Sequence, residues 1–125
     1  MNASEVLALI KPIPSEQIIV GRFSDGVDKC CIIGHVTRLT SKNPSDYSDK
    51  NCSDRNRDGL CVSPVRSLTS QYMEEKHLHS IFFGEVFSKY NSISEVNNGV
   101  VPEYKQPEPK DRCVAFLQDM IKEGY

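Results

Sequence analysis

The chain has 125 residues, of which 15 are basic and 17 acidic, and its formal net charge at pH 7 is −2. This length suits one globular domain, residues 1–125. The small net charge and a pI near 5.9 argue against a nucleic-acid-binding protein, which usually carries a basic patch. No apolar run approaches the ~18 residues of a membrane span, and the N-terminus lacks the basic region of a signal peptide.

The cysteines indicate a reducing compartment. The chain has five, at positions 30, 31, 52, 61 and 113, and no two of them are spaced as CxxC. An odd number that includes an adjacent pair is unlike the disulfide framework of a small secreted domain. We therefore expect a cytoplasmic protein.

The first forty residues predict two helices with a short strand between them. Asn2-Ala-Ser-Glu5 has the form of a helix-capping box, and prolines at 12 and 14 end the helix that follows. The run Ile-Ile-Val at 18–20 favours a strand. Residues 28–40 are best interpreted as a buried helix with Leu39 on its apolar side, although a strand through Cys-Cys-Ile-Ile is a real alternative.

The middle of the chain predicts a loop and two further helices. Residues 41–61 form a long polar stretch, which in a small domain is usually functional or held by local hydrogen bonds. Ser63-Pro64 marks the start of a helix. A stripe of aromatic residues at helical spacing covers 82–90 and is interpreted as part of the core.

The last quarter predicts a turn at Asn97-Asn98-Gly99, a proline-rich connector over 99–108, and a helix from Pro109 to Gly124. Together these patterns predict a mainly α fold. We expect a compact single-domain bundle of about four to five helices, with one short β-hairpin and a long polar loop.

The segment DRNRDG, residues 54–59, is similar to the first half of a calcium-binding loop. Such a loop needs oxygen ligands at alternate positions, a glycine at the sixth position and a bidentate carboxylate at the twelfth. The candidate ligands are Asp54, Asn56, Asp58 and the backbone carbonyl of Leu60. The twelfth position is Val65, so the carboxylate is missing. A polar turn is therefore favoured, with calcium as the minority hypothesis.

A second candidate site is centred on Cys31 and His35. On a helix these residues share one face, a spacing that suits two metal ligands or a thiolate beside an imidazole. Cys52 and Cys61 could complete a zinc site, but zinc ligands usually come in tighter pairs. The favoured alternative is a cysteine that acts as a small buried hydrophobe and a histidine that bonds a loop carbonyl.

Four short motifs resemble those of a group of small bacterial and phage proteins of unknown function. The motifs are Gly21-Arg-Phe-Ser-Asp-Gly26, Cys31-Ile-Ile-Gly-His-Val-Thr-Arg-Leu39, Ser94-Glu-Val-Asn-Asn98 and Lys110-Asp-Arg-Cys-Val-Ala-Phe-Leu-Gln-Asp-Met-Ile121. The resemblance implies a shared architecture and no catalytic residues. It also implies that one structural cluster contains Cys31, Gly34, His35, Arg38 and Asn97. Of these, Cys31, His35, Arg38 and Asn97 are the candidate binding residues.

Two functional hypotheses follow. The first is a non-enzymatic binding protein, such as a phage or mobile-element accessory factor that acts on a host protein or small ligand through 41–61 and 99–108. It is supported by the small size and by the lack of GxSxG, HExxH or a phosphate-binding glycine loop. The second is a small cysteine- or metal-dependent enzyme centred on Cys31 and His35, with Arg38 holding an anion. Neither a cofactor other than calcium nor a nucleic-acid or membrane partner is expected.

Overall fold

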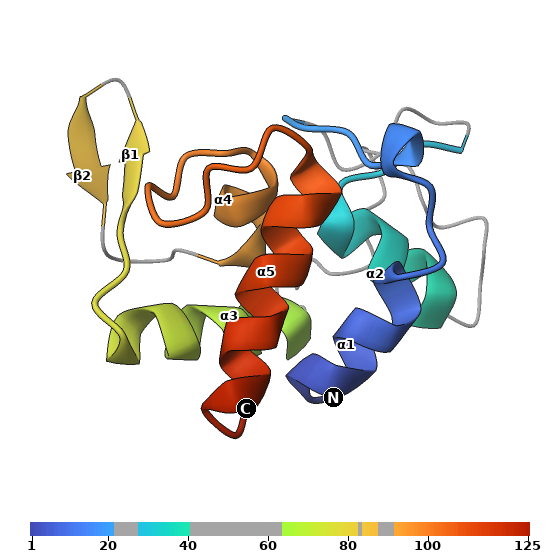
Figure 1. Ribbon diagram of the computed structural model, residues 1–125, viewed down its shortest axis with the longest axis horizontal. Helices are drawn as coiled ribbons and strands as arrows, with labels where there is room; N and C mark the ends of the chain where they lie inside the picture. Colours follow the sequence, from blue (N-terminus) through green and yellow to red (C-terminus); the bar gives the residue numbers. More distant parts are fainter. Residues whose placement is uncertain (22–27, 41–63, 83, 88–91) are drawn as a thin grey trace, which may run out of the picture.

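The computed structural model describes residues 1–21, 28–40, 64–82, 84–87 and 92–125. In chain order these residues form α1 (Ala3–Ile10), a 3-10 turn η1 (Ser15–Gln17), α2 (Ile32–Thr40), α3 (Pro64–Glu75), β1 (Ser80–Phe82), β2 (Glu85–Phe87), α4 (Ile93–Asn97) and α5 (Pro109–Lys122). Figure 1 shows the helices gathered around α5 and the two strands forming a hairpin at one end. The predicted mainly helical fold with one short hairpin is confirmed. Of the helices described, none is long and apolar enough to cross a membrane.

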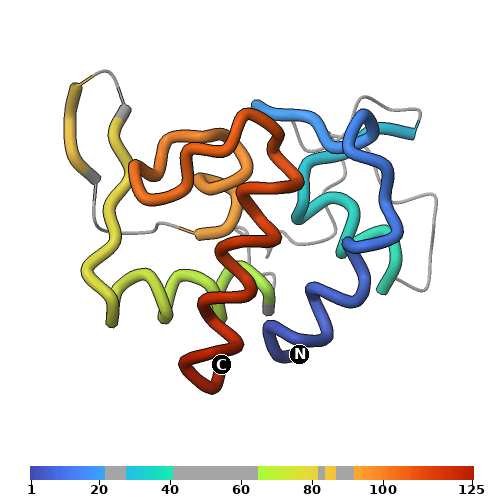
Figure 2. The backbone as a smooth tube through the Cα atoms, in the orientation of Figure 1, coloured from blue at the N-terminus to red at the C-terminus, as the bar shows by residue number. Residues whose placement is uncertain are grey.

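The central helix is α5, which packs against both α1 and α4. The two ends of the chain lie at the same end of the fold (Figure 2), where the Ala3 N–H donates to the Tyr125 carbonyl at 3.1 Å. From α3, the Tyr72 ring meets the Phe116 ring edge-on with centroids 5.5 Å apart. The last helix therefore collects contacts from the first, third and fourth.

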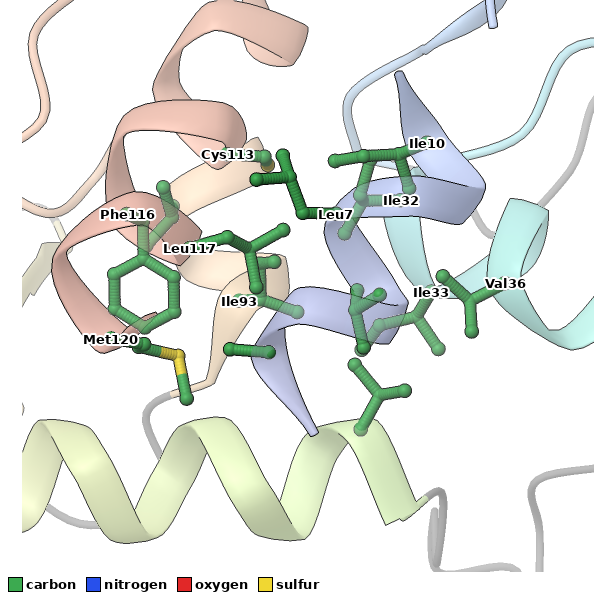
Figure 3. Packing of buried hydrophobic residues seen from close by; sticks show 14 of the residues in the cluster. Leu7, Ile10, Ile32, Ile33, Val36, Ile93, Cys113, Phe116, Leu117 and Met120 are labelled. Atoms are coloured by element: carbon green, nitrogen blue, oxygen red, sulfur yellow. The ribbon is translucent and has the colours of Figure 1, made fainter. Parts of the chain in front are cut away.

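The apolar core lies where α1, α2, α4 and α5 meet (Figure 3). Its fully buried side chains include Ile10, Ile32, Ile33, Ile93, Phe116, Leu117 and Met120. Phe116 is the largest of them, and Tyr104 meets its ring edge-on at a centroid distance of 5.3 Å. Such aromatic pairs add ~0.5–1.5 kcal/mol each beyond the burial of their area. Because the chain has no Trp, Phe116 is the aromatic centre of the core.

The boundaries of the first and last helices follow their predicted capping residues. The Asn2 side chain accepts from the Glu5 N–H at 2.9 Å, which satisfies one of the free amides at the start of α1. At the start of α5, Pro109 occupies a position where no amide partner is needed. Gly124, just beyond its end, has a φ of 86°, a left-handed conformation that glycine adopts without strain. Both predicted helices are confirmed.

The predicted helix over 28–40 is shorter than expected. It begins only at Ile32, because the backbone of Cys30 pairs with the chain segment around Ile18 and is not available for helical bonds. Its last residues, 38–40, are exposed. The prediction that Leu39 faces the core is wrong, since this side chain is 52% exposed.

The predicted strand over 18–20 is reduced to one parallel bridge between Ile18 and Cys30 within the described residues. The Cys30 N–H donates to the Gln17 carbonyl at 3.1 Å, and the Ile19 N–H donates to the Cys30 carbonyl at 3.0 Å. These two bonds fix 17–19 alongside the start of α2.

The helical interpretation of 82–90 is wrong for the residues described. β1 and β2 pair antiparallel, with Ser80 opposite Phe87, Ile81 opposite Val86 and Phe82 opposite Glu85. Gly84 lies in the turn between them with a φ of 82°, which suits a tight hairpin and not a helix. In so short a window, apolar residues fit helical and strand periods alike. Phe83 and Tyr90 lie outside the described residues.

Candidate functional site

Asn97, the last residue of α4, is fully buried and bonds to two segments that are distant in sequence. Its Oδ1 accepts from the Ile32 N–H at 3.1 Å, and its Nδ2 donates to the Ile19 carbonyl at 2.8 Å. The first bond satisfies a free amide at the N-terminus of α2. The second holds residue 19 against α4. One side chain therefore joins three segments of the fold.

The segment 17–21 is held at its two ends as well. His35 Nε2 lies 2.7 Å from the Gln17 carbonyl oxygen, and Asn98 Oδ1 accepts from the Gly21 N–H at 2.9 Å. Together with Asn97 these side chains bind the segment at every second residue. We call His35, Asn97 and Asn98 the polar clamp.

The protonation of His35 follows from this geometry. A carbonyl oxygen can only accept, so Nε2 carries the hydrogen in this pair. Burial of the ring lowers the pKa of His35 below its ordinary 6.5, and the Arg38 charge acts in the same direction. The bond to Gln17 and the Asp28 carboxylate oppose this shift in pKa. At pH 7 the ring is therefore a neutral donor that holds the backbone.

Cys31 lies directly before α2 and is buried. Its carbonyl accepts the first helical bond, from the His35 N–H at 2.9 Å, and its Sγ accepts from the Gly34 N–H at 3.5 Å. Burial raises the pKa of the thiol to about 11, although the amides of Gly34 and Ile33 act against this. At pH 7 only about one thiol in ten thousand is ionised. Because the thiolate is the nucleophile and the metal ligand, Cys31 is poorly suited to either role.

Arg38 is exposed on the last turn of α2. Its guanidinium donates to the Asp28 carbonyl at 3.3 Å, which ties the residues before the helix to its end. The structure thus places Cys31, His35 and Asn97 around the start of α2, and Arg38 at the exposed end of the same helix.

Sequence reasoning missed Arg112, which is buried on α5. Its guanidinium donates to the carbonyl oxygens of Val96 at 3.0 Å, Asn97 at 2.7 Å, Gln106 at 2.7 Å and Pro107 at 3.0 Å. Two of these carbonyls end α4, where helical partners are lacking. Arg112 therefore fixes the end of α4, and with it the backbone of Asn97, to the connector that leads into α5.

The close fit around Arg112 explains the glycine of the predicted turn. Gly99 has a φ of 77°, and a Cβ there would lie 3.2 Å from Arg112 Cζ. The sequence did carry a sign of this arrangement. Arg112, Phe116 and Met120 recur every four residues, so the arginine lies on the buried stripe of its helix.

Three buried polar atoms have no hydrogen-bond partner within the described residues: Arg66 Nε, His79 Nδ1 and Gln106 Oε1. None of them belongs to the polar clamp. Within the described ranges, no group of three or more His, Cys, Asp and Glu side chains is placed to hold a metal ion. The candidate calcium ligands Asp54, Asn56, Asp58 and Leu60 lie outside the described residues, as do Cys52 and Cys61.

No family model matches this chain, and neither a curated protein nor a solved structure shows significant similarity to it. The function of this chain is therefore inferred from its own geometry. The groups that chemistry would use, Cys31 and His35, are buried and bonded to backbone, which makes them parts of the framework.

Proposed function

We propose that this chain is a non-enzymatic binding protein that recognises a partner protein through the connector over 99–108. The observation that carries the proposal is that buried anchors hold this irregular segment in one conformation while the side chains between them face solvent. Loops fixed on a rigid scaffold are common binding surfaces. A preordered loop also loses less conformational entropy on binding.

The anchors of the connector alternate with exposed charges. Val101 and Tyr104 are buried, with 1% and 6% exposure, and the Tyr104 hydroxyl donates to Asp119 Oδ2 at 2.7 Å. Further along, Arg112 binds the carbonyls at 106 and 107. Between these anchors, Glu103 and Lys105 are exposed. A partner can therefore recognise two charges of opposite sign that are carried by an anchored stretch of backbone.

A charge swap tests the proposal without altering net charge. The double variant Glu103→Lys, Lys105→Glu is compared with a control swap at two exposed helical positions, Glu74→Lys with Lys122→Glu. We expect cross-linked capture from a bacterial lysate to recover one abundant partner with the wild type and the control. The connector swap should reduce that recovery at least about tenfold. Recovery of no partner, or of equal amounts with the connector swap, would contradict the proposal.

Origin in a phage or mobile element, and a host protein as the partner, rest on the sequence resemblance and stay predictions. The contact surface predicted over 41–61 also stays a prediction, because it lies outside the described residues. For calcium at 54–60, the test is a titration that follows the Gly59 amide by NMR. If no shift occurs at millimolar calcium, the hypothesis is wrong.

The alternative, an enzyme that uses Cys31, requires a reactive thiolate. The raised pKa of this thiol argues against it. We expect mass-spectrometric mapping to find Cys31 unlabelled by iodoacetamide in the native protein at pH 8 and labelled after unfolding. Rapid native labelling, together with loss of an activity in Cys31→Ser, would favour the enzyme instead.

A further inference from the structure

The hairpin has one covered edge and one open edge. On β1, the Ile81 N–H donates to the Val100 carbonyl at 2.9 Å and so points away from β2. Ile81 is opposite Val86, and in an antiparallel pair both residues at such a position direct their N–H and C=O groups outward. The backbone of Val86 therefore points away from β1. Within the described parts of the chain, no residue pairs with it, and β2 lies at the outer margin of the fold (Figure 1).

The same two residues form an exposed apolar pair. Val86 is 63% exposed and Ile81 is 42% exposed, and residues opposite each other in a sheet share one face. The three-residue length of β2 and the charge of Glu85 limit pairing at this edge, but the other common protections, lysine, proline and a bulge, are absent from the described residues of β2. A two-stranded hairpin is marginally stable alone, and additional strands with an apolar face stabilise it.

We propose that the open edge of β2 pairs with β2 of a second copy of this chain, antiparallel and around a two-fold axis beside Val86. The Val86 N–H of each copy then donates to the Val86 carbonyl of the other. The product is a four-stranded sheet in the order β1, β2, β2, β1. It aligns Ile81 and Val86 of both copies in one apolar row. This inference does not depend on the function proposed for the connector.

Charge disfavours one neighbouring symmetric pairing of the two β2 strands, the one whose two-fold axis lies beside Glu85. An axis beside Glu85 would place the two Glu85 carboxylates directly opposite each other, and like charges in such pairs are destabilising. An axis beside Val86 instead places Glu85 opposite Phe87 of the second copy. The net charge of −2 per chain adds little long-range repulsion between copies.

The contact is small, so the association is weak. Three-residue strands bury far less than the ~1,200 Å² typical of stable interfaces. We therefore expect a dissociation constant between about 10 µM and 1 mM. Self-association should thus depend strongly on protein concentration.

Sedimentation equilibrium over that range tests the proposal, with Val86→Lys as the disrupting variant. Val20→Lys is the control, because Val20 is also exposed, at 49%, and lies outside the hairpin. We expect the wild type and Val20→Lys to rise from 14.1 kDa toward twice that mass, and Val86→Lys to stay monomeric. In hydrogen exchange, the Val86 amide should become protected only at high concentration, while the Ile81 amide is protected throughout.

Two results would overturn the proposal. One is a wild type that stays monomeric at 1 mM, with the Val86 amide exchanging at the same rate at every concentration. The other is a Val86→Lys variant that dimerises as the wild type does. Because Glu85 and Phe87 alternate with Val86 and so direct their amides toward β1, the exchange of these two amides reports on the hairpin itself, and a variant that loses the hairpin is recognised. Val86→Thr, which keeps the strand and removes little apolar area, should then still dimerise.

Discussion

The end of α4 and the β1–β2 hairpin differ in where their polar and apolar groups lie. Around the end of α4, the buried polar side chains of Asn97 and Arg112 bond backbone groups from distant parts of the chain. In the β1–β2 hairpin, apolar side chains are exposed and a strand edge is open. In the first region, the polar side chains form their hydrogen bonds inside the fold. In the second, the backbone groups of Val86 and the apolar side chains of Ile81 and Val86 face solvent.

This difference separates residues that look functional from residues that are available for function. Cys31 and His35 attract attention in the sequence because their side chains suit chemistry, and Asn97 does so through the resemblance. Buried and bonded to backbone, they order the segment 17–21 and the start of α2. Val86 is predicted from the sequence only as one apolar residue of the helical pattern over 82–90, yet it has the most accessible large apolar side chain of those described.

The largest expected effect is at Arg112. Arg112→Leu removes a guanidinium that bonds the carbonyls of Val96, Asn97, Gln106 and Pro107. Its bonds to Val96 and Asn97 are buried, and of these two carbonyls only that of Val96 keeps another donor among the described residues, the Gly99 N–H. We expect urea unfolding to give a loss of about 3–5 kcal/mol. Arg112→Lys should recover part of it, and Lys122→Leu, at an exposed position, should cost less than ~0.5 kcal/mol. A loss below ~1 kcal/mol for Arg112→Leu would contradict the account.

The next effect is at Asn97. Asn97→Ala leaves the Ile32 N–H and the Ile19 carbonyl without their partner, and we expect a loss of about 2–3 kcal/mol in the free energy of unfolding. Asn98→Ala is the matched control, because its bond to Gly21 is exposed and should contribute about 1 kcal/mol or less. Equal losses at the two asparagines would show that burial does not distinguish them.

Two valines compare the regions directly. Val96 on α4 is 0% exposed and Val86 on β2 is 63% exposed. Val96→Ala should therefore lower the free energy of unfolding by about 2 kcal/mol. Val86→Ala, measured at a concentration where the protein is monomeric, should change it by less than ~0.5 kcal/mol. If Val86→Ala lowers the free energy of unfolding as much as Val96→Ala does, the hairpin is part of the core and the contrast between the two regions is wrong.

The smallest effect is a dependence of stability on pH. Because the pKa of His35 is below 6.5 in the folded state, the unfolded chain binds more protons between that folded pKa and 6.5. The free energy of unfolding should therefore fall as the pH is lowered through this window. In His35→Gln this part of the slope should be absent, while in His77→Gln, an exposed position, it should persist. An unchanged slope in His35→Gln would assign the dependence to other groups.

The sequence predicted those elements whose cause is local. Pro109 and Gly124 bound a helix with regular apolar spacing, so α5 could be recognised with no knowledge of its neighbours. One short hairpin was predicted, but its position at 80–87 was missed because a few apolar residues fit both periods, although Gly84 was the available indication of a turn. The resemblance implied that Asn97 belongs to one cluster with Cys31 and His35, but its bonding partners could not be predicted, since they lie 65 and 78 residues away along the chain. A hydrogen bond between a side chain and a residue far away in the sequence leaves no pattern in the spacing of neighbouring residues.

The central claim is that His35 and its neighbours are framework groups, and an NMR pH titration of the His35 ring tests it most directly. Long-range nitrogen–proton spectra report both the pKa and the tautomer. The account predicts a pKa below 6.5 and a neutral ring protonated at Nε2, the atom that meets the Gln17 carbonyl. A pKa at or above 6.5, or a neutral ring protonated at Nδ1, would contradict it and return His35 to the list of candidate catalytic groups.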